Sequence, residues 1–234
     1  MKENIDIMLN AQSHWQKISD AKNKIEKYKK SIEKWQNTFK ENEKSNNKIK
    51  NEITTIKGSI KDKETDLMEI DEQKSSLQQK RLQAVKEKEL KAFDKEIEIK
   101  SSEADVLENA LLELYDTLSI KEDELKKNTL DQKESLETGN SDIDDLNNRI
   151  KNENKNITEN SEAFETHYDA IHNTIKQRFK KLLESKNGVG VCEVKNEVCT
   201  GCNFQVPPAL ANDALNSSNI ITCTNCGRYI FVRS

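Results

Sequence analysis

The first 187 residues contain no proline and only two glycines, Gly58 and Gly139. Proline and glycine are the residues that end or weaken an α-helix. A stretch of this length with so few of them favours very long helices. Only 33% of all residues are hydrophobic and 34% are charged, which is too little apolar surface for a large globular core. The same composition would suit a disordered chain, and the spacing of the apolar residues decides between the two.

That spacing indicates a coiled coil. From Ile18 to Leu77, mostly apolar residues recur in alternating steps of three and four, and a second run extends from Leu90 to Ile157. Such steps place the side chains in one stripe along a helix, and a coiled coil buries this stripe against a second helix. An extra step of four after Gln132 is a stutter, which unwinds the supercoil locally.

Two arrangements fit these stripes: one continuous helix in a parallel dimer, or two helices folded into an antiparallel hairpin with a turn near residues 83–89. Polar residues inside the stripes favour the hairpin, because a polar side chain in the stripe costs stability unless it finds a partner. A register that places Asn46 opposite Asn128 also places Asn42 opposite Gln132.

The same register makes two further predictions. It places the large side chain of Trp35 over Gly139, which has no side chain. It also sets Lys74 against Lys100, which is unfavourable unless the two ammonium groups point apart. Each arm of such a hairpin would extend about 120 Å at the rise of an α-helix.

Near the C-terminus the chain contains two CxxC pairs, Cys199-Thr-Gly-Cys202 and Cys223-Thr-Asn-Cys226, with twenty residues between them. This spacing is typical of a zinc ribbon, in which four thiolates hold one structural Zn²⁺ ion. The alternatives are two disulfides or a thioredoxin-like redox motif, but the redox motif requires a βαβ context that the sequence lacks. Four protein ligands leave zinc no open position, so the site is predicted to be structural and not catalytic.

The residues around the cysteines predict short strands and one short helix. Gly188 and Gly190 end the preceding helix, and alternating apolar residues over 189–198 predict a β-hairpin. Pro208 suits the first turn of a helix over 209–215, and 229–232 reads as a closing strand. The predicted fold is therefore mainly α: an antiparallel two-helix coiled-coil hairpin over residues 1–187 and a small β zinc ribbon over 188–234.

Other residues that can bind metals are interpreted more simply. Cys192 is predicted to be a small buried strand residue and not an exchangeable fifth ligand. His167 and His172 are five residues apart and so lie on different faces of a helix, and His14 is alone in the sequence. His167 and His172 are therefore predicted to be solvated.

Two groups of residues are candidates for contact with a partner. A basic cluster precedes the ribbon and could bind phosphates, although cations at the end of a helix are also favoured by its dipole. Apolar residues of the ribbon, taken to be exposed, could bind a protein. The basic cluster is Lys176, Arg178, Lys180, Lys181 and Lys186, and the apolar candidates are Phe204, Val206 and Leu210.

Several classes of function are disfavoured. The net charge of −4 gives no general reason to expect nucleic acid. The sequence has no apolar run of a signal peptide, no run of apolar residues long enough to cross a bilayer, and no recognisable catalytic motif. We therefore expect a cytoplasmic protein that is not an enzyme, with no membrane partner and no small-molecule substrate.

The cysteine-containing tail resembles the bacterial C4-type zinc ribbon proteins. The resemblance rests on the segments Val191–Cys202 and Ile221–Phe231 and on the Val206-Pro-Pro sequence between them. The segment Arg81–Ile97 is similar to the hairpin tip of the same family. The resemblance implies a long N-terminal helical hairpin with its turn at this tip, followed by a ribbon whose zinc ligands are Cys199, Cys202, Cys223 and Cys226.

The resemblance also implies candidate partners. Members of this family are linked to flagellar biogenesis, to type III secretion and to sigma-54, as partners or chaperones, and some to RNA. The predicted function is accordingly a non-enzymatic, zinc-binding adaptor or chaperone-like protein that contacts other proteins. The alternatives are a nucleic-acid-binding regulator that uses the ribbon and the basic cluster, and a coiled-coil regulator of RNA polymerase. The tips of such regulators depend on acidic residues, and here lysines stand among the acidic residues of the tip, so this signal is weak.

Overall fold

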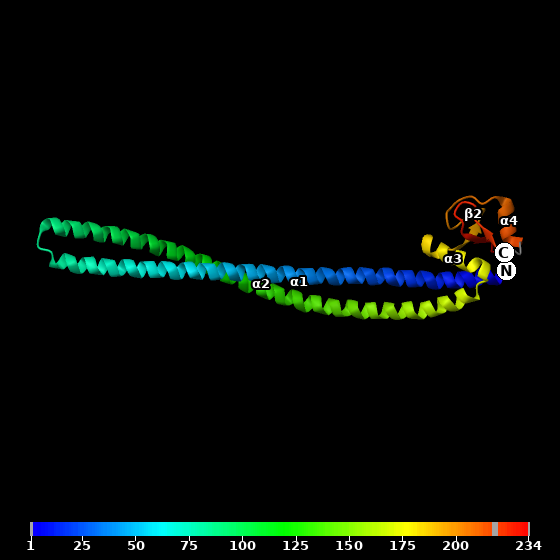
Figure 1. Cartoon of the computed structure of the whole chain (residues 1–234), viewed down its shortest axis with the longest axis horizontal. Helices are drawn as coiled ribbons and strands as arrows, with labels where there is room; N and C mark the ends of the chain where they lie inside the picture. Colours follow the sequence, from blue (N-terminus) through cyan, green and yellow to red (C-terminus); the bar gives the residue numbers. More distant parts are fainter. Residues whose placement is uncertain (1, 217–219, 234) are drawn as a thin grey trace. The chain divides into compact units, whose positions relative to one another are not determined.

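The structure, a computed structural model, describes residues 2–216 and 220–233. Helix α1 (Lys2–Gln83) and helix α2 (Glu87–Ala170) run antiparallel, joined by a three-residue break at 84–86 (Figure 1). Both strands of the coiled coil therefore come from one chain, and the predicted mainly α fold is confirmed. The break lies within the segment where the turn was predicted. None of the described helices has a stretch apolar and long enough to span a bilayer.

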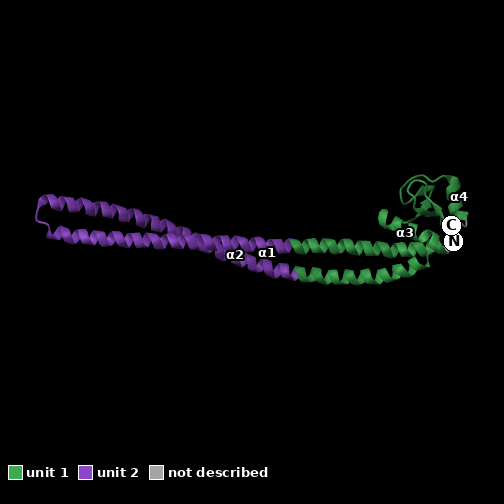
Figure 2. Ribbon diagram, in the orientation of Figure 1, with its two compact units in different colours: residues 1–33, 142–234 green, residues 34–141 purple. Residues whose placement is uncertain are grey.

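The chain divides into two compact units (Figure 2). Unit 1 combines residues 1–33 with 142–234, and unit 2 consists of residues 34–141. The predicted domain boundary between residues 187 and 188 separates the helical hairpin from the ribbon. The division into two compact units does not test that boundary, so it stays a prediction.

In unit 2 the apolar stripe is narrow and heavily flanked by charge. Its buried residues are the small set Ile49, Ile53, Ile60, Ala104 and Leu111. Ion pairs between the helices lie at the edges of the stripe, such as the one between Lys57 and Glu122 at 2.7 Å. Exposed pairs of this kind contribute little to stability, so the stripe provides most of the attraction between the helices.

The polar residues of the stripe gather in unit 2, but with different partners from those predicted. Asn46 is 5% exposed, and its Nδ2 donates to Oε1 of Gln132 at 2.5 Å. Its hydrogen-bond partner is therefore Gln132 and not the predicted Asn128, which lies one helical turn away on α2. Asn42, Asn46, Asn128 and Gln132 nevertheless line one cavity of about 180 Å³. All four amides thus lie in one polar layer.

Gly139 accommodates two aromatic side chains of α1. A Cβ atom at this position would lie 2.8 Å from Cε3 of Trp35 and 2.7 Å from Cε1 of Phe39. The predicted contact of Trp35 with Gly139 is therefore present, and Phe39 shares the space. The missing side chain allows α2 to pass close to both rings.

Unit 1 contains a third helix that the sequence analysis did not separate from the coiled coil. Helix α2 ends at Ala170, and α3 (Asn173–Ser185) begins after Ile171 has turned into the core, where it is 2% exposed. His172 is the N-cap of α3, and its ring nitrogen accepts from the backbone N–H of Thr174. The helix was expected to continue to residue 187. The free energy gained by burying Ile171 offsets the hydrogen bonds lost at the break between α2 and α3.

The ribbon in unit 1 is a four-stranded sheet in the order β2-β1-β4-β3. Strand β1 (Val191–Lys195) pairs antiparallel with β2 (Val198–Cys199) and parallel with β4 (Tyr229–Phe231), which pairs antiparallel with β3 (Ile221–Thr222). The predicted helix is present as α4 (Pro208–Asn216), with proline at its first position.

The two faces of this sheet serve different cores. Val191 and Tyr229 belong to a core shared with α1, α2 and α3. Cys192, Val194 and Ile230 belong to a second core within the ribbon. Because successive side chains of a strand point to opposite faces, one face of the sheet packs against the helices and the other face packs within the ribbon.

Candidate metal centre

The four predicted ligands converge on one point of the ribbon. The Sγ atoms of Cys199, Cys202, Cys223 and Cys226 all lie within 4.8 Å of one another. Sγ of Cys199 is 3.9 Å from that of Cys226, and Sγ of Cys202 is 3.8 Å from that of Cys223. A tetrahedron with Zn–S bonds of about 2.3 Å has its sulfur atoms about 3.8 Å apart. The four thiols therefore fit one tetrahedral structural zinc ion.

Two similar turns hold these cysteines. In the first, the N–H of Asn203 donates to the carbonyl oxygen of Cys199 at 2.8 Å, and in the second the N–H of Gly227 donates to that of Cys223 at 2.9 Å. Asn203 and Gly227 both have positive φ values, 55° and 74°. Each turn thus bends the chain so that both sulfur atoms of its pair point the same way.

Burial makes metal-free thiolates unfavourable at two of the four positions. It raises the pKa of Cys199 to about 12 and the pKa of Cys223 to about 11. Burial would also raise the pKa of Cys202, but hydrogen bonds, foremost from the side chain of Asn225, outweigh it and lower this pKa to about 7. A metal ion must therefore displace protons from the two deeper thiols.

The fifth cysteine lies beside the site without being part of it. Cys192 is 5% exposed, and its Sγ lies 3.4 Å from Sγ of Cys199. Its thiol also donates to the carbonyl oxygen of Tyr229 at 3.7 Å. Burial raises the pKa of Cys192, so the group remains a neutral thiol. This placement agrees with the interpretation as a buried strand residue.

A glutamine of α1 completes the first strand of the ribbon. Oε1 of Gln12 accepts from the N–H groups of Gly190 at 2.7 Å and Val191 at 2.8 Å, and its Nε2 donates to the carbonyl oxygen of Val191 at 3.1 Å. The Gln12 side chain therefore bonds the backbone groups at the start of β1 as a neighbouring strand would. Gln12 precedes the periodic stripe, and its local sequence contains no signal of so distant a partner.

Two arginines attach the second cysteine turn to α3. Nε of Arg228 donates to the carbonyl oxygen of Val189 at 2.8 Å, and its Nη2 donates to that of Lys186 at 3.2 Å. Arg178 donates from Nη2 to the carbonyl oxygen of Gly227 at 3.1 Å. Carbonyl groups at the end of a helix lack partners within it, and Arg228 supplies one here.

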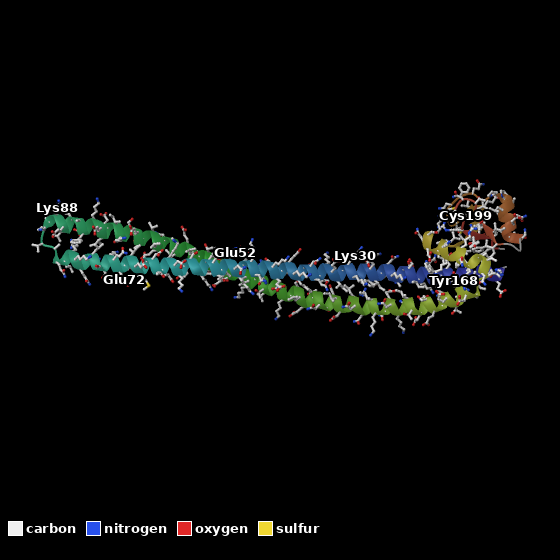
Figure 3. The ribbon with its side chains drawn as sticks, in the orientation of Figure 1. Lys30, Glu52, Glu72, Lys88, Tyr168 and Cys199 are labelled. Carbon is white, nitrogen blue, oxygen red and sulfur yellow. The ribbon has the colours of Figure 1, made fainter. Side chains whose placement is uncertain are left out.

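Other members of the predicted basic cluster interact with unit 1 itself. Nζ of Lys176 lies 2.6 Å from a carboxylate oxygen of Asp169 and 4.6 Å from the ring centre of Tyr168. Nζ of Lys180 lies 5.5 Å from the same ring, which is labelled in Figure 3. Much of the cluster thus has a structural role that local sequence could not reveal.

The three apolar contact candidates differ in exposure. Phe204 is 51% exposed, and Leu210 is partly buried against the ribbon core. The expectation that Val206 is exposed is wrong, because this residue is 2% exposed and packs in that core. Its backbone follows an isolated bridge between Val198 and Gln205, which turns the next side chain inward.

The histidines of the two long helices meet in unit 1. The rings of His14 and His167 are stacked with their centres 5.6 Å apart, and Nδ1 of His14 lies 2.8 Å from Oδ1 of Asn160. Both histidines are half-buried, so the expectation that His167 is solvated is wrong, whereas His172 is exposed as expected. The antiparallel pairing of α1 with α2 brings them together, which spacing along one helix could not show.

Comparison with known proteins agrees with the site and the fold. Residues 198–230 match the family model of the C4-type zinc ribbon domain. No curated protein matches the chain. Three solved bacterial structures are similar over nearly their whole lengths at low sequence identity, which shows a shared fold.

The first is CT398 from Chlamydia trachomatis, with a TM-score of 0.89, 19% identity, and coverage of 100% of this chain and 99% of the other. The HP0958 protein from Helicobacter pylori has a TM-score of 0.62 and 16% identity, with coverage of 99% and 98%. A protein from Mycobacterium smegmatis has a TM-score of 0.55 and 12% identity, with coverage of 95% and 98%. Residues 198–230 are therefore a C4-type zinc ribbon domain, carried by a chain with the helical-hairpin fold of these bacterial proteins.

Proposed function

We propose that the chain is a non-enzymatic adaptor that recognises another protein through its zinc ribbon. The observation that carries this proposal is Phe204, a large apolar side chain that is 51% exposed and directly follows the first cysteine turn. The N–H of Cys199 donates to the carbonyl oxygen of Phe204 at 3.0 Å, so its backbone is held to a metal ligand. Aromatic residues on rigid supports are frequent centres of protein interfaces.

The neighbouring surface supports the same proposal. Val198 is 36% exposed and Leu215 is 39% exposed, so the ribbon presents further apolar surface. Four protein ligands would leave the zinc no position for a reacting water molecule. The metal would then act as a support for the turn that carries Phe204, and recognition would depend on the metal only through the fold.

The proposed partners are sigma-54 or components of flagellar or type III secretion systems, in the manner of an adaptor or chaperone. The sequence resemblance of the tail and of the segment Arg81–Ile97 supports these candidates. They can be examined one at a time with purified proteins, because the proposal concerns direct contact.

The test is direct binding of the full-length protein to purified sigma-54 and to each secretion component by calorimetry. For the true partner we expect Phe204→Ser to weaken binding at least about tenfold, as is typical of a central interface residue. Leu112→Ser is the matched control, because Leu112 is also an exposed apolar residue, at 64%, but lies in unit 2. Equal affinities of Phe204→Ser and wild type for every partner that binds would contradict a role for the ribbon surface.

The alternative of nucleic-acid binding has less support, because Lys176 and Arg178 already make contacts within unit 1. It predicts an affinity that falls steeply with salt and with Lys181→Glu/Lys186→Glu. A gel shift with RNA and DNA at low salt distinguishes it from the adaptor. A regulator of RNA polymerase would instead affect transcription through the turn of unit 2.

A further inference from the structure

Two large apolar side chains are exposed where α1 ends and the chain turns into α2, and neither is buried in a core. Leu82 is 82% exposed and Val85 is 93% exposed, the highest values among the exposed large apolar residues of the described chain. Neither has the positive φ that would restrict the choice of residue. Polar residues and glycine are the usual occupants of a turn. We call Leu82 and Val85 the apolar tip.

The tip is surrounded by positive charge. Residues 80–91 contain five basic and two acidic side chains, although the whole chain has a net charge of −4. One of the five, Arg81, is paired with Asp94. Lys86 lies 3.4 Å from Glu89, and Lys91 lies 2.8 Å from Glu87. Lys80 and Lys88 form no ion pair with any residue that the structure describes. We call Lys80, Lys86 and Lys88 the lysine rim, and Figure 3 labels Lys88 at the turn.

We propose that the apolar tip and the lysine rim dock on an anionic lipid surface. Two apolar side chains at a turn can enter the boundary between headgroups and acyl chains, and lysines beside them can keep their ammonium groups among the anionic headgroups. This contact is shallow and needs no membrane-spanning helix. The sequence-based expectation of no membrane partner rested on the lack of such a helix and does not bear on surface contact.

The form of the tip favours a lipid surface over a protein groove. A helix that binds in a groove presents apolar residues along one face over several turns. Here the two exposed residues are three positions apart, and Val85 lies in the break at 84–86, outside any helix. So small an apolar contact suits a soft planar surface that supplies additional attraction through its charge.

Charge would also determine which part of the chain faces the lipid. Because residues 80–91 carry an excess of positive charge, the remainder of the chain is more acidic than the total of −4. An anionic surface therefore attracts the turn and, on average, repels the rest of the chain, which has a net negative charge. The turn of unit 2 is the part expected to make contact.

The test is co-sedimentation of the full-length protein with vesicles of phosphatidylcholine alone or mixed with phosphatidylglycerol. We expect binding to the mixed vesicles only, weakened by added salt. Lys86→Glu/Lys88→Glu should lower partitioning at least about 30-fold, because each lysine near the surface contributes about a fivefold factor. Leu82→Ser/Val85→Ser should lower it at least about tenfold through lost apolar contact.

Val106→Ser/Ile120→Ser is the control, because these two residues are 66% and 67% exposed in unit 2 but lie outside the turn. It should bind as wild type does. The proposal is overturned if wild type does not sediment with the mixed vesicles, if it binds both kinds of vesicle equally, or if the control loses binding as fully as the tip variant. Tip-dependent binding to an acidic protein without vesicle binding would also overturn it.

Discussion

The side-chain amide of Gln12 hydrogen-bonds both the N–H and the carbonyl oxygen of Val191, a residue 179 positions away. An amide side chain offers a donor and an acceptor side by side, as a neighbouring strand does. This contact joins the first turns of α1 to the strand that leads into the zinc site. It makes the N-terminal helix part of the ribbon's support within unit 1.

Replacing this amide should loosen the start of β1. Gln12→Leu removes three hydrogen bonds and leaves the buried N–H groups of Gly190 and Val191 without their acceptor, at a cost of about 2–4 kcal/mol. Hydrogen exchange of these two amides should become faster than in wild type. Gln36→Leu, at an exposed position of α1, is the control and should leave their exchange unchanged. Unchanged exchange in Gln12→Leu would refute the proposed support.

The two glycines of the helical arms should respond oppositely to alanine. Gly58→Ala meets no atom within 4 Å, so it should stabilise unit 2 by about 1 kcal/mol through helix propensity. Gly139→Ala would bring a methyl group within 2.8 Å of Trp35, and overpacking should cost about 1–3 kcal/mol, more than the propensity gain. Urea unfolding followed by circular dichroism measures both variants. The close passage at Gly139 is refuted if both variants gain stability equally.

Zinc binding should weaken as the pH falls. Because burial raises the pKa of Cys199 to about 12 and that of Cys223 to about 11, both are protonated in the metal-free ribbon at neutral pH. Zinc must release at least these two protons, so its apparent affinity should fall about 100-fold for each unit of lowered pH. Competition with a chromogenic chelator at several pH values measures this slope. An affinity independent of pH would contradict the protonation of the two thiols.

Cys192 should be dispensable for metal binding despite its position. Cys192→Ala removes a buried thiol and should cost about 1 kcal/mol of stability while leaving one zinc ion per chain. Cys223→Ala, which removes one of the four converging thiols, should reduce the zinc content of the purified protein. Elemental analysis of both variants decides the point. Loss of zinc from Cys192→Ala would mean that this residue is a ligand.

The polar pair in unit 2 should show coupling. Asn46→Leu alone leaves the amide of Gln132 without its partner, whereas Asn46→Leu/Gln132→Leu replaces both polar groups by apolar ones. We expect the single variant to lose about 1 kcal/mol and the double variant to regain it. A double-mutant cycle from urea unfolding measures the coupling, and additive effects would show that the hydrogen bond contributes nothing.

The zinc ligands and the coiled coil were predictable because their signals are local or periodic, whereas the choice of a hairpin rested on the polar residues of the stripes and on the family resemblance. Two CxxC pairs define a metal site by spacing alone, and the steps of three and four in the stripes define a coiled coil. The polar layer of Asn46 was predictable for the same reason. Its hydrogen bond to Gln132 was not, because Asn128 and Gln132 lie one turn apart on the same stripe of α2 and periodicity does not choose between them.

The features that the sequence did not reveal depend on contacts between distant residues. The end of α2 at Ala170 contains neither proline nor glycine, and Ile171 turns inward only because a core exists to receive it. Val206 was expected to be exposed, but the bridge between Val198 and Gln205 turns its side chain into the ribbon core. Support by Gln12 likewise requires the helices and the ribbon to be in place.

The composition of unit 1 from residues 1–33 and 142–234 has a consequence for how such a chain can vary in length. Unit 2 is an insertion between two segments that already belong together, and both of its connections are continuous helix. Removing one heptad from each helix shortens both arms of unit 2 by the same length. The apolar stripes of the two helices then still face each other. The residues that meet in unit 1 keep their partners, so descendants with shorter or longer arms can arise without rebuilding the ribbon.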